Sequence, residues 1–176
     1  MTGFALVPAT AGDAPAIVSL RNAVAERLTR DHGRGHWSSC VTERGVLQGL
    51  RTSRLLVAWD GPALLATLQL ATRKPWAIDK RYFAASPRPL YLTAMAVDPD
   101  RQRSGVGRRC LEEARRIAQA WPGDAIRLDA YDHPSGAGAF YEKCGFREVG
   151  RVVYRAVPLI YYELLLPPDQ PAPPSS

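Results

Sequence analysis

One stretch limits the fold of this chain more than any other: an apolar run, a glycine-rich turn and an amphipathic pattern follow one another between Leu90 and Arg116. Residues 90–97 are nearly all apolar, too few for a helix of that hydrophobicity, and Asp-Pro-Asp stops them, so they predict a buried strand. Apolar residues then recur at helical spacing, at Leu111, Ala114, Ile117 and Ala118. This pattern predicts a helix lying on a sheet.

The turn that joins them, residues 102–107, has the features of an anion site. Gly105 and Gly107 let the backbone approach a ligand and point successive N–H groups into one concavity. The helix behind adds positive partial charge, which suits a pyrophosphate. Four arginines have the wrong sign for a helix N-terminus unless an anion lies between them: Arg101, Arg103, Arg108 and Arg109. A tight turn without a ligand is the alternative. Neither a Walker A loop nor a complete dinucleotide fingerprint is present.

Two runs carry a resemblance to a known family. Met95-Ala96-Val97-Asp98-Pro99, followed by Gln102-x-x-Gly105-x-Gly107, resembles the acetyl-coenzyme A signature of the GNAT superfamily of N-acetyltransferases, which reads Arg or Gln, two residues, Gly, one residue, Gly or Ala. Ala137 to Phe146 resembles the family's second signature, an Ala, then Tyr, then Gly-Phe. Both occur in the family's order, and two motifs are more specific than either alone.

The resemblance implies an α/β (α+β) fold: a GNAT-like mixed, mainly antiparallel twisted sheet of about seven strands flanked by about four helices and splayed between strands four and five. Hydrophobic patterns along the chain agree with that order. They predict strands over residues 4–8, 55–59, 63–71, 90–97, 125–131, 146–154 and 160–166. They predict helices after Asp13, over residues 39–50, behind the glycine turn and over residues 135–144. We expect one N-acetyltransferase domain, residues 1–166, and a disordered Pro-rich tail, residues 167–176.

By resemblance, acetyl-coenzyme A would lie along the splay as cosubstrate. The main chain of Met95, Ala96 and Val97 would pair with its pantetheine arm. The amides that would hold its pyrophosphate are those of Gln102, Arg103, Ser104, Gly105, Val106, Gly107 and Arg108. Ala137 and Phe140 of the second signature are further expected contacts. One departure is that Pro134 stands where the family often has Asn, seven residues before its tyrosine.

The resemblance gives Tyr141 the role of general acid toward the departing thiolate; packing of its helix on the sheet is the alternative. Acyl transfer to an amine also needs a base, because an ammonium has no lone pair. Glu43, Asp129 and Tyr131 are candidates. We prefer Asp129, which lies on the strand beside the splay, although a satisfied structural carboxylate is the alternative reading.

Other expectations concern the acceptor side. In the family the first helical region lies beside the acceptor, so His36, Trp37 and Glu43 are candidate substrate contacts, with surface loop and cap roles as the alternative. Residues 72–89 form a long connection with aromatic residues, which favours substrate contact. An irregular excursion or a homodimer interface is the alternative there.

The composition limits the kinds of partner that the protein is expected to bind. Lys and Arg outnumber Asp and Glu by 23 to 17, giving a net charge of +6 that attracts anions. The basic residues are spread along the chain without interleaved aromatics, which disfavours nucleic acid. No apolar run is long enough for a membrane span and no signal segment is seen, so a cytoplasmic protein is expected. Cys40, Cys110 and Cys144 lack metal-ligand spacing and are expected to be free thiols, with no metal bound.

The sequence thus predicts an acetyl-coenzyme A dependent N-acetyltransferase that acts on a primary amine of a small molecule or polypeptide by direct attack. One alternative is an acyl-coenzyme A binding regulator or sensor without turnover. Another is an enzyme directed to charged tRNA.

Overall fold

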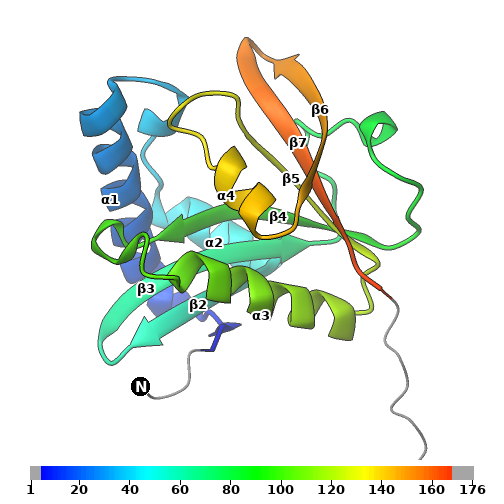
Figure 1. The fold of residues 1–176 in the computed structure, drawn as a ribbon. Coiled ribbons are helices and arrows are strands. Elements are labelled where there is room, and N and C mark those ends of the chain that lie inside the picture. The colour runs from blue at the N-terminus through cyan, green and yellow to red at the C-terminus, as the bar shows by residue number, and fades with distance from the viewer. Residues whose placement is uncertain (1–4, 168–176) are drawn as a thin grey trace, which may run out of the picture.

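The computed structural model describes residues 5–167, which form a seven-stranded sheet in the order β1-β2-β3-β4-β5-β7-β6 (Figure 1). The strands are β1 Val7–Pro8, β2 Arg54–Asp60, β3 Ala63–Ala71, β4 Pro89–Val97, β5 Ala125–Tyr131, β6 Arg147–Tyr154 and β7 Val157–Leu165. The helices are α1 Ala14–His32, α2 Glu43–Thr52, α3 Val106–Ala120 and α4 Gly138–Lys143. All neighbouring strands are antiparallel except β4 and β5, which are parallel. The expected fold class is confirmed.

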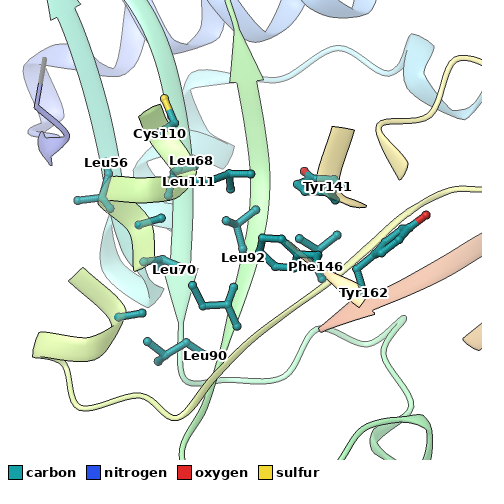
Figure 2. Close-up of a cluster of buried hydrophobic side chains, with 14 of the residues drawn as sticks. Leu56, Leu68, Leu70, Leu90, Leu92, Cys110, Leu111, Tyr141, Phe146 and Tyr162 are labelled. Atoms are coloured by element: carbon teal, nitrogen blue, oxygen red, sulfur yellow. The ribbon is translucent and has the colours of Figure 1, made fainter. Parts of the chain in front are cut away.

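Helices α3 and α4 cover one side of the sheet, here named the α3 face (Figure 1). Alternate residues of the strands point to this side because the side-chain period of a strand is two. The resulting core contains Leu56, Leu68, Leu70, Leu90, Leu92, Cys110, Leu111, Tyr141, Phe146 and Tyr162 (Figure 2). Leu111, Ala114 and Ala118 are buried along one stripe of α3, so the helical spacing predicted from the sequence is confirmed.

The opposite side, named the α1 face, is covered by two different segments. Helices α1 and α2 pack on β2, β3 and β4 through a cluster that contains Ile17, Val46, Val57 and Ala96. Residues 72–89 cover β5 and β7, where Ile78 and Phe83 are buried with Tyr91 and Tyr161. Helices were expected on both faces. Over β5 and β7 the cover is instead an irregular segment that holds one short 3-10 helix, η3 Lys80–Tyr82.

Strands β4 and β5 separate after a short parallel stretch. Their pairing runs only from Pro89 opposite Ala125 to Tyr91 opposite Arg127. Beyond that point β4 stays paired with β3, and β5 stays paired with β7. The predicted splay between the fourth and fifth strands therefore opens at Tyr91.

Several helices and strands begin at residues other than those predicted. The first strand was expected over residues 4–8, but only Val7 and Pro8 pair with β2; Phe4 lies outside the described residues, as do residues 168–176 of the predicted tail. Helix α2 starts at Glu43 instead of near residue 39, because the Thr42 hydroxyl caps it by accepting from the Gly45 amide at 3.2 Å. Helix α4 starts at Gly138 instead of residue 135 or 136.

The last hairpin turns earlier than expected. The break was predicted at Ala156-Val157-Pro158, but Arg155 and Ala156 form a two-residue turn with φ of 48° and 66°. Two left-handed residues in succession match the twist of a hairpin. Pro158 therefore lies inside β7, opposite Val153.

Candidate active site

The glycine turn presents open amides at the start of α3. Gly105 is the residue before the helix, with a φ of 88° in the left-handed region, and no side chain caps the helix there. The amides of Val106, Gly107 and Arg108 are first-turn donors, which a helix leaves without intrahelical partners. The Gln102 side-chain amide donates from Nε2 to the Val97 carbonyl at 3.3 Å and so ties the turn to the end of β4. This arrangement can bind an anion through main-chain N–H groups.

Phe140 brings the two signature runs together. A Cβ atom added to Gly107 would lie 3.0 Å from Phe140 Cζ and 3.7 Å from Val97 Cγ2. Position 107 therefore needs a small residue because α4 packs against the first turn of α3. Ala137, also predicted as a cofactor contact, is exposed directly before α4. The four flanking arginines are all exposed: Arg101, Arg103, Arg108 and Arg109.

The free edge of β4 carries a distortion beside the splay. The register with β3 shifts between Thr67 and Gln69, where Ala94 and Met95 together face a single residue of β3. Ala94 has a φ of 51°, a left-handed conformation that costs a non-glycine residue free energy and marks this as a bulge. Such bulges turn main-chain groups out of the regular ladder, so an amide here can point into the splay. No feature of the sequence predicted this bulge.

Tyr141 lies at the splay on the α3 face. Its ring packs on Phe146 and Tyr162, and its hydroxyl lies 4.0 Å from Met95 Sδ on β4 (Figure 2). Burial raises the pKa of the Tyr141 hydroxyl well above its ordinary value, and the nearby Asp129 charge adds to the effect. The hydroxyl therefore keeps its proton at neutral pH and is able to donate it.

Asp129 lies on β5 with its side chain on the α1 face, since its strand partner Tyr161 belongs to that core. Burial raises the pKa of its carboxyl group. No ion pair involves Asp129 within residues 5–167, and its charge raises the pKa of Tyr131, Tyr141 and Tyr161. A carboxylate whose pKa is raised binds a proton more readily than one in water, so Asp129 is a candidate proton acceptor.

The other candidate bases differ in position. Tyr131 is two residues beyond Asp129 on the same face, and its hydroxyl donates to the His36 carbonyl at 3.3 Å. Glu43 is exposed in the first turn of α2, a helix that packs mainly on α1 and β2. The structure therefore brings Asp129, Tyr131 and His36 together. It gives Glu43 no hydrogen bond or ion pair in the described part of the chain.

Residues 72–89 stabilise an ion pair in the sheet. Arg127 Nε donates to Glu163 Oε2 at 2.9 Å, and both side chains are almost fully buried. Ala84 completes the pair, since its carbonyl accepts from Arg127 at 2.6 Å and its amide donates to Glu163 at 3.2 Å. Glu163 is thus the counter-charge of the buried Arg127. Substrate contact by this segment, or a dimer interface, stays a prediction.

Arg21 is a buried charge that the sequence reading missed. It lies in α1 on the same stripe as Ala14 and Ile17, which are fully buried. Its Nε and Nη2 atoms are enclosed and have no hydrogen-bond partner among the described residues, and this burial lowers its pKa. The signal was present in the sequence, since an arginine interrupts the apolar spacing of that helix.

Comparison with known proteins defines the class. Among solved structures, the chain resembles an N-acetyltransferase from Staphylococcus aureus Mu50, with a TM-score of 0.69, 15% identity, and 94% of this chain and 100% of that chain covered. It resembles the ribosomal-protein-S18-alanine N-acetyltransferase from Escherichia coli, with a TM-score of 0.69, 17% identity, and 93% and 94% covered. It also resembles yncA from Salmonella typhimurium, solved with its cofactor acetyl-CoA, with a TM-score of 0.67, 16% identity and 98% of both chains covered. At such identities these matches show a shared fold: that of the acetyltransferases.

The sequence itself matches the model of the acetyltransferase (GNAT) domain over residues 51–148, which is more than half of the chain. The protein therefore belongs to the GNAT acetyltransferase family, as the two signature runs predicted. No curated protein matches it in sequence. Within residues 5–167, no helix is long and apolar enough to cross a membrane.

Proposed function

We propose that the protein transfers an acetyl group from acetyl-coenzyme A to a primary amine of a small molecule or polypeptide. The observation that carries this proposal is the meeting of three features at one splay. These are the free, bulged edge of β4, the uncapped first turn of α3 behind Gly105, and the Tyr141 hydroxyl 4.0 Å from Met95 Sδ. Together they can hold an extended, anionic thioester and protonate its sulfur.

The residues fit the coenzyme. The main chain of Met95 to Val97 would pair with its amide-containing arm, because β5 does not pair with β4 beyond Tyr91. The amides of Gln102 to Arg108 would hold its diphosphate, with help from the exposed arginines beside the turn. Ala137 and Phe140 would line its path past α4. When bound there, acetyl-coenzyme A supplies the acetyl thioester.

The acid and the base lie on opposite faces of the sheet. Asp129, on the α1 face, would take a proton from the acceptor ammonium, directly or through water, and leave a lone pair free for attack. A main-chain amide at the Ala94–Met95 bulge would stabilise the developing negative charge on the carbonyl oxygen. As the C–S bond breaks, Tyr141, on the α3 face, would give its proton to the departing sulfur, and the second proton lost by the attacking nitrogen would return to the Tyr141 oxygen through water. The amine thus enters from one side of the splay and the thiol leaves on the other.

The role of Tyr141 is tested by removing its hydroxyl. Tyr141→Phe should lower kcat by about 10²- to 10⁴-fold, the range for loss of a general acid or base, while the Kd for acetyl-coenzyme A stays nearly unchanged. Thiol release and calorimetric titration of the coenzyme measure the two quantities. Tyr162→Phe is the matched control, because that ring lies 6.0 Å from Tyr141 in the same core. Equal turnover of Tyr141→Phe and the parent at every pH would remove Tyr141 from the mechanism.

A panel of amines tests the reaction itself. Release of coenzyme A thiol that depends on an added amine, with the acetylated amine identified by mass spectrometry, is the expected result. Tight binding of the coenzyme without amine-dependent release across a broad panel would instead favour a sensor. Affinity for tRNA retained at physiological salt would point to an acceptor carried on tRNA.

A further inference from the structure

A hollow of about 250 Å³ opens on the α1 face, beside the far end of β5. Its walls come from the loop after α1, from the end of β5 with the connection that follows it, and from the start of β7. The lining residues include Arg34, His36, Trp37, Tyr131 and His133. Nothing in the two signature runs accounts for this hollow.

The aromatic side chains that line the hollow contact one another. The Trp37 and His133 rings have centroids 4.8 Å apart at an interplanar angle of 40°. Tyr131 lies 6.1 Å from Trp37 at 70° and 6.2 Å from His36 at 27°. Rings at these distances and angles are in the range of favourable aromatic contacts, and a further planar ring can join the same arrangement.

The polar atoms of Trp37 and Tyr131, and one ring nitrogen of His133, are hydrogen-bonded within the chain. Trp37 Nε1 donates to the Gly33 carbonyl at 3.0 Å, and the Tyr131 hydroxyl donates to the His36 carbonyl at 3.3 Å. His133 Nδ1 lies 2.7 Å from the Ser135 hydroxyl. What Trp37 and Tyr131 can offer a ligand is therefore mainly their ring faces and C–H edges, which suit an apolar planar group.

The loop after α1 holds Trp37 in place. A Cβ atom added to Gly35 would lie 2.5 Å from Trp37 Cζ2, so only glycine leaves room for the indole to fold back over the loop. Gly33, whose carbonyl binds the indole, has a φ of 79° that favours glycine as well. The Thr29 and Ser38 hydroxyls are hydrogen-bonded at 2.7 Å across the same loop. A ring held in advance in this way loses little freedom on binding.

The charge of Arg34 and the distance from Tyr131 to Asp129 limit which ligands suit the hollow. Arg34 lines the hollow, so a positive charge inside the rings would be repelled, which argues against capture of an ammonium group there. Tyr131 lies two residues beyond Asp129 on the same face of β5, a separation of about 6.6 Å along a strand. A molecule that fills the hollow with a ring can therefore reach Asp129 with an amine on a short alkyl chain.

We propose that the hollow between Trp37, Tyr131 and His133 binds the aromatic ring of the acceptor, so that the preferred substrates are primary amines joined to an aromatic ring by a short alkyl chain. This inference rests on the proposed acetyl transfer. It assigns Trp37 to recognition of the acceptor and gives it no part in the chemical steps.

The test varies the ring and the alkyl chain length of the amine, and it removes the Trp37 ring from the wall of the hollow. Benzylamine, phenethylamine and 3-phenylpropylamine are measured beside 2-cyclohexylethylamine and hexylamine, which have no aromatic ring. Phenethylamine or 3-phenylpropylamine should give the highest kcat/KM, because benzylamine falls short of Asp129. Trp37→Leu should raise KM for the best aromatic amine about tenfold, the upper range for loss of one aromatic contact. The KM for acetyl-coenzyme A should not change, and the KM for hexylamine should rise much less, because an alkyl chain makes no ring-to-ring contact with Trp37.

Trp121→Leu is the control, because Trp121 directly follows α3, stacks with Arg54 and is not among the residues that line the hollow. Equal kcat/KM for phenethylamine and 2-cyclohexylethylamine, or a Trp37→Leu variant that raises KM equally for every amine, would overturn the ring site while the acetyl transfer stands. No acetylation of any amine by a protein that binds the coenzyme would overturn the proposed function itself. Circular dichroism confirms that Trp37→Leu is folded.

Discussion

The two faces of the sheet bury different kinds of side chain. On the α3 face, the buried side chains are apolar or aromatic, and the predicted coenzyme contacts are main-chain groups at the edge of β4 and in the turn before α3. On the α1 face lie all three buried polar or charged residues of the described chain: Thr67, Arg127 and Glu163. Arg21, with its enclosed guanidinium atoms, and the half-buried Asp129 are there too.

The proposed function gives a reason for the difference. A ligand held by peptide N–H groups would make no demand on side chains, so the α3 face could carry a plain hydrophobic core. A face that accepted protons and recognised an amine would need ionisable and polar side chains, and each of these costs free energy when it leaves water. Replacing individual side chains on the α1 face measures that cost.

The largest effect is expected at the buried ion pair. Arg127→Met leaves the Glu163 carboxylate buried without a counter-charge, which should cost about 3–5 kcal/mol of stability. Denaturant unfolding of the purified protein measures the loss. Adding Glu163→Leu to Arg127→Met should recover most of it, because a well-packed apolar pair removes the uncompensated charge. If the single variant lost less than about 1 kcal/mol, the pair would be no more than a surface-type contact.

A smaller effect of opposite sign is expected in α1. Arg21→Met keeps the straight aliphatic stem and removes guanidinium atoms that are enclosed without partners, so stability should rise by about 1–3 kcal/mol. Arg27→Met on the same helix is the control; its partner Asp31 lies 2.9 Å away in an exposed pair, and its loss should cost only about 0.5 kcal/mol. A loss of stability in Arg21→Met would mean that this guanidinium has a favourable partner.

The smallest effect is a pH dependence at Asp129. Burial raises the pKa of this carboxyl group in the folded protein, so folding favours its protonated form. The associated stability is present at acidic pH and is lost as the pH rises through the folded-state pKa. Melting curves should show that the Tm of the parent falls more than that of Asp129→Asn between acidic and neutral pH. Parallel curves for the two proteins would contradict a raised pKa.

Most of the architecture could be read from the sequence because it depends on local patterns. The alternation in β5, the apolar stripe of α3 and the Asp60-Gly61-Pro62 turn between β2 and β3 each have a short-range cause. Gly145 follows α4 with a φ of 90°, the left-handed conformation in which glycine commonly ends a helix. The two family signatures supplied the order of the strands and the splay, which periodicity alone does not give.

The features that escaped prediction depend on contacts between distant segments. The packing of Trp37 on His133 joins two loops, and neither loop has a hydrophobic period that would announce it. The Ala94 bulge and the Arg155–Ala156 turn place ordinary residues at positive φ, where sequence rules expect glycine or asparagine. Glu163 as the partner of Arg127 required the register of β5 against β7.

The short parallel pairing of β4 and β5 has a mechanical consequence. Only three register pairs, all at one end, join the half-sheet of β1 to β4 with the half-sheet of β5 to β7. A molecule wedged along the open part would form hydrogen bonds with the first half and press against α4 on the second. Bound substrate would then add contacts between two half-sheets that already share the core on the α3 face, and amide hydrogen exchange along β4 and β5 beside the gap would slow together.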